Sequence, residues 1–199
     1  RPLSIIRNFQ IRLPMNKLFT LFGLLILTLS SYAQIKLVAW DSIPVTRGGE
    51  MLMNATTGGL NCPQFSEIDL DGDGIKDLVS FERNFYGAVK TFLNTGTNGN
   101  PSYTYAPEYR LYFPQMRKWM LLRDYNCDGK ADIFTAVPAG IAVYRNDSDA
   151  SGLKFTQVMS LLIGEGLNGP APVYVSPPDI PSIEDIDNDG DLDILSFNI

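Results

Sequence analysis

The feature that most constrains this 199-residue chain is a nine-residue pattern that occurs three times. Each copy has Asp or Asn at positions 1, 3 and 5, Asp at position 9, glycine at position 6, and two apolar residues directly afterwards. The copies begin 55 and 61 residues apart, and we name them loop 1 (69–77), loop 2 (124–132) and loop 3 (185–193). Three ungapped copies at such intervals indicate an internal repeat, so the fold is expected to be built from units of about that length.

The spacing of the oxygen side chains predicts a loop that wraps around a hard cation. Calcium takes about six to eight oxygen ligands, and nine residues can supply four side chains and one main-chain carbonyl. Glycine at position 6 permits the turn that this path needs. The carbonyl is expected from position 7, which is Ile75, Lys130 or Asp191. The alternative is that each loop is only a hairpin turn rich in Asp, Asn and Gly, but three copies with the same four oxygen positions favour a metal ion.

The residues around the loops predict strands rather than helices. An EF-hand needs its closing acid at position 12, where this chain has Ser80, Thr135 and Ser196. The flanking segments are short and strand-like, at 64–68, 78–81, 119–122, 133–137 and 194–197. Each loop is therefore expected to join two strands.

Further strands are expected between the loops, so that each complete repeat contains four. Their predicted ranges are 89–93, 103–113, 140–145 and 153–163. Four-stranded units of about 40 to 60 residues, each unable to bury its face alone, are typical of a β-propeller. The predicted fold class is all-β, with β-propeller blades that are four-stranded antiparallel repeats.

The loops resemble those of the FG-GAP or VCBS repeat family, the integrin α-subunit type of β-propeller, in which an Asp-x-Asp-x-Asp-Gly-x-x-Asp loop links the first two strands of a blade. The resemblance covers residues 58–199. The segments 85–89 (Phe-Tyr-Gly-Ala-Val) and 138–142 (Pro-Ala-Gly-Ile-Ala) are loose counterparts of the Phe-Gly and Gly-Ala-Pro signatures that name the family.

By this resemblance the chain binds up to three Ca²⁺ ions, one in each loop. The implied metal ligands are Asp69, Asp71, Asp73, the Ile75 carbonyl and Asp77; Asp124, Asn126, Asp128, the Lys130 carbonyl and Asp132; and Asp185, Asp187, Asp189, the Asp191 carbonyl and Asp193.

Residues 15–33 are interpreted as a secretory signal peptide. Met-Asn-Lys at its start is followed by an apolar run at 18–29 and by Ser31 and Ala33, the small residues that precede a cleavage site. The apolar run is shorter than the roughly 20 residues that span a bilayer, so no membrane span is expected after cleavage. Residues 1–14 are interpreted as an upstream non-native extension.

The mature part, residues 34–199, is expected to form one propeller fragment, with repeats at about 58–115, 116–170 and 171–199. The third repeat stops after its second strand, so we expect a partial propeller of about two and a half blades, a curved stack rather than the ring of about seven blades typical of the family. The chain is therefore interpreted as part of a longer reading frame. The leader and the stretch 59–69 also resemble exported repeat proteins of Bacteroidetes-type bacteria.

Charge and composition exclude several classes of function. The chain has no histidine, which excludes His-dependent triads and His-ligated zinc sites. Its net charge of −6 argues against nucleic acid as a partner. The three loops hold 12 of the 22 acidic residues, and residues 1–33 carry four basic residues and no acid. The acidity of the mature chain is thus expected to reflect its metal sites.

Two further motifs carry weaker predictions. A disulfide is expected between Cys62 and Cys127, because each lies near a metal loop and export permits oxidation; buried free thiols are the alternative. The stretch 164–169 matches a dinucleotide-binding glycine pattern, but Pro170 and Pro172 follow where a helix should begin, so a loop is expected.

The leading hypothesis is a secreted or cell-surface calcium-binding propeller that acts as an interaction or adhesion module for an extracellular protein or carbohydrate. Catalysis is not expected, because calcium leaves its aspartates poor general acids and the same acids recur in every repeat. The alternative is a non-catalytic accessory domain of an extracellular polysaccharide-degrading enzyme.

Overall fold

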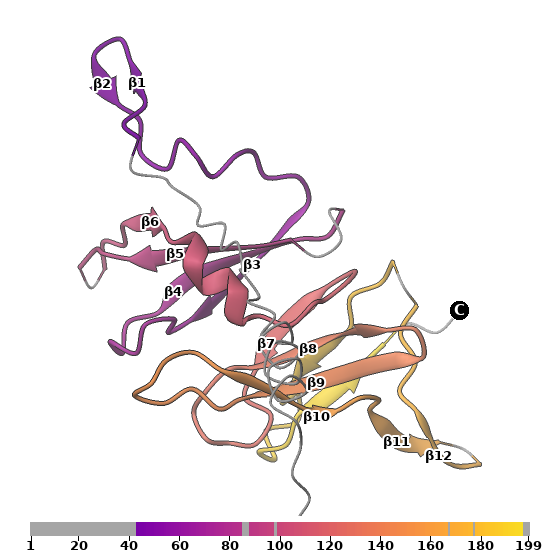
Figure 1. Cartoon of the computed structure of the whole chain (residues 1–199). Helices are drawn as coiled ribbons and strands as arrows, with labels where there is room; N and C mark the ends of the chain where they lie inside the picture. The colour runs from indigo at the N-terminus through magenta and orange to yellow at the C-terminus, as the bar shows by residue number, and fades with distance from the viewer. Residues whose placement is uncertain (1–42, 85–87, 98, 167, 177, 197–199) are drawn as a thin grey trace, which may run out of the picture. The chain divides into compact units, whose positions relative to one another are not determined.

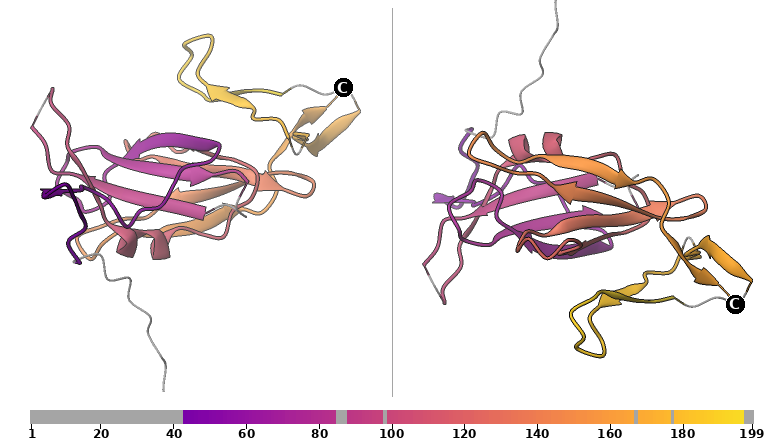
Figure 2. Two further views of the ribbon diagram at one scale, coloured as in Figure 1. Left: turned by 90° about the horizontal axis from the view of Figure 1, so that it is seen from above. Right: turned by 90° about the horizontal axis from the view of Figure 1, so that it is seen from below.

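The computed structural model describes residues 43–84, 88–97, 99–166, 168–176 and 178–196. These residues form strands, turns and one short 3₁₀-helix (Figures 1 and 2), which confirms the all-β prediction. Within the described ranges no helix has the length and apolar character needed to cross a membrane. The predicted extension at 1–14 and signal peptide at 15–33 lie outside the described residues.

Two four-stranded antiparallel sheets, each with its strands paired in chain order, contain most of the strand residues. The first sheet consists of β3 (Pro63–Ile68), β4 (Asp77–Glu82), β5 (Ala88–Asn94) and β6 (Tyr103–Tyr105). The second sheet consists of β7 (Met120–Arg123), β8 (Asp132–Val137), β9 (Gly140–Asn146) and β10 (Phe155–Met159). The prediction of four strands in each of the first two repeats is confirmed (Figure 1).

The remaining strands form three two-stranded hairpins. They are β1 (Thr46–Arg47) with β2 (Glu50–Met51), β11 (Ile163–Gly166) with β12 (Gly169–Pro172), and β13 (Ser182–Glu184) with β14 (Asp193–Leu195). The β13–β14 hairpin holds the two strands predicted for the third repeat. The glycine-rich stretch 164–169 lies in the β11–β12 hairpin, where Gly166 pairs with Gly169, so no helix follows it.

Two predicted strands prove shorter than expected. The strand predicted at 103–113 ends at Tyr105, and a 3₁₀-helix follows at Pro107–Tyr112. Proline lacks the N–H that a continuing strand would use, and its fixed φ suits the start of a helix. The strand predicted at 153–163 is limited to β10, whose register shifts between Gln157 and Met159, the kind of irregularity that ends regular pairing.

The apolar core has two parts, one on each face of the second sheet. One cluster joins the first sheet to the second and includes Val79 and Phe81 on β4 and Ile133 on β8. The other packs Phe134 of β8 with Ile183 of β13. Because successive residues of a strand point to opposite faces, the neighbours on β8 enter different clusters. The second sheet thus buries both of its faces, as expected for a repeat unit that depends on its neighbours.

Trp119 offers a test of this packing, since its side chain is 0% exposed in the second cluster. We expect Trp119→Ala to lower the free energy of unfolding by about 3–5 kcal/mol in urea titrations, through lost burial and a cavity. Its indole N–H has no hydrogen-bond partner in the described structure, so Trp119→Phe should cost clearly less. Leu111→Ala, at a side chain that is 71% exposed, should change stability by less than about 0.5 kcal/mol. Equal losses for the two Trp119 variants would contradict this account.

Candidate metal centre

Each of the three predicted loops lies between the first and second strand of its unit (Figure 1). Loop 1 joins β3 to β4, loop 2 joins β7 to β8, and loop 3 joins β13 to β14. The closing aspartate at position 9 is the first residue of the second strand in every case, as Asp77, Asp132 and Asp193. The prediction that each loop joins two strands is confirmed.

The main chain turns in the same way in all three loops. At position 6 the φ angles are 85°, 83° and 96°, for Gly74, Gly129 and Gly190. This is the left-handed region that glycine enters without steric cost, which explains the glycine in each copy. Position 4 also has positive φ, at Gly72, Cys127 and Asn188. The sequence pattern did not reveal this second requirement, because three different residue types fill the position.

The carboxylate at position 1 accepts main-chain N–H groups from inside its own loop. Asp69 accepts Gly72 N at 2.7 Å and Gly74 N at 2.9 Å. In the other two loops, position 1 likewise accepts the N–H of position 6, from Gly129 to Asp124 at 2.7 Å and from Gly190 to Asp185 at 3.1 Å. The first aspartate therefore sets the path of the loop as well as offering oxygen atoms to an ion.

The carboxylate at position 5 accepts the N–H of position 7, the residue whose carbonyl is a predicted ligand. The distances are 2.7 Å from Ile75 N to Asp73, 2.9 Å from Lys130 N to Asp128, and 2.9 Å from Asp191 N to Asp189. This bond, present in every copy, restrains the main chain at the predicted carbonyl ligand.

The closing aspartate connects its loop to the rest of the sheet. Asp77 accepts Leu70 N at 2.8 Å through Oδ2 and Asn94 N at 2.7 Å through Oδ1. Asp132 accepts Tyr125 N at 2.7 Å and Asn146 N at 2.6 Å in the same arrangement. In both sheets one oxygen thus holds position 2 of the loop, and the other holds the end of the third strand.

Burial changes the proton affinity of these two closing carboxylates. Asp77 is 2% exposed and Asp132 0% exposed. Burial raises the pKa of each above its ordinary value of 3.8, and the main-chain N–H bonds only partly oppose this. Neighbouring carboxylates raise both pKa values further, Asp71 and Asp73 acting on Asp77. The negative charge of the closing aspartate is therefore costly in the chain without metal.

The structure brings together part of the predicted ligand sets of loops 1 and 3. Carboxylate oxygens of Asp69, Asp71 and Asp77 lie within 4.8 Å of one another, and so do those of Asp185, Asp187 and Asp193. Clusters of three carboxylates fit a hard divalent cation such as calcium. The position 5 aspartates of loops 1 and 3, Asp73 and Asp189, do not belong to these groups.

Loop 2 differs from the other two loops. No cluster of three acidic side chains forms there, in the described part of the chain. Position 3 is Asn126, whose Nδ2 donates to Oδ2 of Asp128 at 3.0 Å. An amide in place of a carboxylate removes one negative charge and one ligand oxygen from the position, so loop 2 fits a cation less well.

Asn94 and Asn146 belong to the site, although the sequence pattern did not single them out. Both end a third strand, and each donates its main-chain N–H to a closing aspartate. The available signal was an asparagine followed by a polar turn after the third strand of each repeat. That signal is common to many hairpins.

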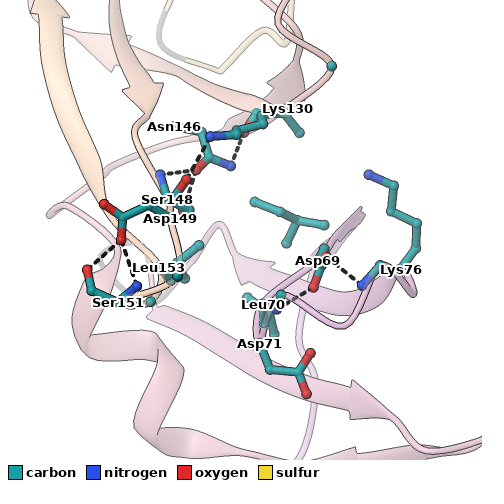
Figure 3. A pocket seen from close by; sticks show the side chains of 17 residues that line it. Asp69, Leu70, Asp71, Lys76, Lys130, Asn146, Ser148, Asp149, Ser151 and Leu153 are labelled. Carbon is teal, nitrogen blue, oxygen red and sulfur yellow. Dashed lines mark hydrogen bonds between the residues drawn. The ribbon is translucent and has the colours of Figure 1, made fainter.

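A cavity of about 770 Å³ adjoins loops 1 and 2 (Figure 3). Asp69 and Asp71 of loop 1 line it together with Asn146, the last residue of β9, and Ser148, two residues further along the chain. Lys130 of loop 2 also lines it, and its Nζ donates to the Ser148 carbonyl at 2.7 Å. Two predicted ligands of loop 1, Asp69 and Asp71, are thus accessible to solvent and solutes.

The predicted disulfide is not formed, and the alternative of buried thiols is wrong, because Cys62 and Cys127 are both free and exposed. Met120 N donates to Oε1 of Gln64 at 3.2 Å, which sets the start of β7 beside the start of β3. Cys62 precedes β3, whereas Cys127 lies in the loop that follows β7. The two thiols also have different neighbours: Asn84 Nδ2 donates to Cys62 Sγ at 3.2 Å, whereas Cys127 Sγ donates to the Gly190 carbonyl at 3.9 Å.

Residues 124–196 match the family model of the FG-GAP-like repeat. The matched segment begins at the first residue of loop 2 and includes all of loop 3. No curated protein and no solved structure matches the chain. The match supports the FG-GAP resemblance over the segment that contains two of the three loops.

The pKa shifts predict that acidification stabilises the chain when it is stripped of divalent cations. A carboxyl whose pKa is higher in the folded than in the unfolded chain binds more protons when folded, so stability rises as pH falls toward the ordinary value of 3.8. We expect the melting temperature to rise between pH 7 and pH 5, above the acidic range in which the lowered pKa values of Asp128, Asp147 and Asp149 act in the opposite direction. Asp77→Asn should reduce this slope, whereas Glu108→Gln, on the 3₁₀-helix, should preserve it. A melting temperature that falls over this range, or an unchanged slope in Asp77→Asn, would contradict the prediction.

Proposed function

We propose that the chain is a calcium-stabilised module of the FG-GAP type, secreted or displayed at a cell surface, that binds an extracellular protein or carbohydrate. The observation that carries the proposal is the geometry of the repeated loop. Three loops of identical spacing each join two strands, and two of them bring three carboxylates within 4.8 Å. The match of residues 124–196 to the FG-GAP-like repeat supports the same reading.

Calcium is the cation that the donor set favours. The predicted donors are carboxylate, amide and carbonyl oxygens, which hard cations prefer to the nitrogen and sulfur ligands typical of zinc. Flexible loops of this kind tolerate the six to eight oxygens of calcium better than the strict octahedron of magnesium. A bound divalent cation also offsets the repulsion between the clustered carboxylates and the cost of burying Asp77 and Asp132.

A structural role for the ion agrees with the hydrogen bonds of the loops. The aspartates at positions 1, 5 and 9 accept main-chain N–H groups, for example from Gly74 to Asp69 and from Leu70 to Asp77. Carboxylates engaged in this way organise the main chain and are poorly suited to proton transfer. An ion there would hold the first two strands of each unit together, so we assign the module no catalytic function.

The arrangement of the sheets supports propeller blades as the larger architecture. The second sheet buries one face with the first sheet and the other with the β13–β14 hairpin. Side chains also cross between units, since Arg123 Nε donates to the Ile183 carbonyl at 2.7 Å and Arg123 pairs with Glu184. Successive units that share cores in this way are expected of blades, and the exposed loops between strands would provide the surface for the partner.

Removal of calcium tests the structural role directly. Ions that bind only the folded chain stabilise it by mass action, by about 2.7 kcal/mol per site when free calcium is 100 times the dissociation constant. We expect the melting temperature of the full chain in 10 mM calcium to exceed that in excess EGTA by roughly 5 °C or more. Magnesium at the same concentration should give a smaller shift. Superimposable melting curves in calcium and EGTA would reject the proposal.

Substitution in one loop tests whether the sites are separate. The double variant Asp69→Asn, Asp73→Asn removes two charges from loop 1 without changing side-chain size. We expect calorimetric titration to detect one ion fewer per chain, with the remaining binding unchanged. The variant Glu108→Gln, which removes an acid outside the loops, should keep the full number. Loss of all calcium binding in the double variant would show that the loops do not bind independently.

A further inference from the structure

We propose that Asn94 and Asn146 are positioning residues for the calcium loops, which fasten loops 1 and 2 to the third strand of their sheets and thereby raise the affinity for the ion. This inference rests on the proposed function, since it assigns a role within the same calcium sites. Neither residue belongs to the nine-residue pattern.

The first contact is made by the main chain. Asn94 N donates to Asp77 Oδ1 at 2.7 Å, and Asn146 N donates to Asp132 Oδ1 at 2.6 Å. A hydrogen bond to a charged carboxylate is stronger than one between neutral groups. Each closing aspartate is therefore restrained from outside its loop by the last residue of the third strand.

The second contact is made by the side-chain amide and reaches the loop itself. Asn94 Nδ2 donates to the Lys76 carbonyl at 3.2 Å, and Asn146 Nδ2 donates to the Ala131 carbonyl at 3.1 Å. These carbonyls belong to position 8, which lies between the predicted carbonyl ligand and the closing aspartate. Holding this peptide unit restrains the predicted ligands on both sides of it.

The third contact fixes the asparagine side chain in turn. Oδ1 of Asn94 accepts Gly96 N at 3.1 Å and Ser102 N at 3.2 Å, and Oδ1 of Asn146 accepts Ser148 N at 3.1 Å. An amide side chain carries both a donor and an acceptor, so one asparagine can bind the loop and the following turn together. Aspartate would lose the donor, and alanine would lose both groups.

The two asparagines occupy equivalent places in the two sheets. Asn94 lies 17 residues after Asp77, whereas Asn146 lies 14 residues after Asp132. The pairing is nevertheless the same: the residue after the closing aspartate pairs with the second residue before the asparagine, as Leu78 with Phe92 and Ile133 with Tyr144. The sheet register therefore determines the contact, which recurs in spite of different connection lengths.

The test uses the full chain with loop 1 as its sole intact loop. The parent variant for this test carries substitutions in the other two loops, Asp124→Asn, Asp128→Asn, Asp185→Asn and Asp189→Asn. Asn94→Ala is then added to this parent, and calcium dissociation constants are measured by calorimetry at a temperature where circular dichroism shows the native fold. We expect Asn94→Ala to weaken calcium binding about 10- to 100-fold, the usual effect of losing a group that orients a metal ligand.

Thr95→Ala is the matched control. Thr95 Oγ1 donates to the Ser102 carbonyl at 3.2 Å in the same turn, and Thr95 makes no hydrogen bond to loop 1 in the described structure. We expect Thr95→Ala to lower the melting temperature equally with and without calcium and to leave the dissociation constant within about twofold. Asn94→Ala should also reduce the shift in melting temperature that calcium produces, which a purely structural role in the turn would not do.

Three outcomes separate the two proposals. If the parent binds calcium and Asn94→Ala binds it within twofold of the parent, the positioning role is overturned while the calcium site stands. If the parent itself binds no calcium, the proposed function fails. If Asn94→Ala does not fold, Asn146→Ala in a parent that retains loop 2 alone decides the question by the same criterion.

Discussion

The closing carboxylate is the group on which the rest of each unit depends. In the two complete sheets it is almost fully buried, and it accepts one N–H from its loop and one from the third strand. A buried charge is tolerated only when hydrogen bonds or a counter-ion compensate it. The geometry of the loop and the end of the third strand are therefore linked through one side chain, and the proposed binding of a cation would depend on the same side chain.

The same carboxylate also connects the loop to the apolar core. In the second sheet, the residue after it begins the apolar part of β8, whose successive side chains Ile133 and Phe134 enter the two clusters of the core. An ordered loop therefore holds the first two strands at the place where the core begins. Calcium binding and core packing would then both stabilise the second strand, the ion at its first residue and the core along the residues that follow.

Repetition explains why much of this architecture could be predicted from the sequence. Three copies of one spacing identified the loops and their flanking strands, because recurrence distinguishes this pattern from an ordinary turn that is rich in Asp, Asn and Gly. Contacts set by sheet register could not be predicted in this way. Asn94 and Asn146 lie at different distances from their loops along the chain, and the local signal, an asparagine before a polar turn, is common to many hairpins.

Other expectations failed for local reasons. The predicted strand at 103–113 did not allow for Pro107, which starts a 3₁₀-helix. The predicted pairing of Cys62 with Cys127 relied on their proximity to the loops along the chain, whereas the two free thiols have different neighbours in the fold. In both cases the outcome depends on geometry that the repeat pattern does not contain: the fixed φ of a proline in one case and the positions of two side chains in the fold in the other.

The unequal spacing between closing aspartate and asparagine, 17 residues in one sheet and 14 in the other, has an evolutionary consequence. Insertions and deletions in the connection between the second and third strands are neutral for the metal loop as long as the pairing of the strands is kept. The hairpin tips can then diverge in length and composition from copy to copy. A repeated framework of this kind, which we propose that calcium stabilises, can vary its exposed surface without losing the elements that hold it together.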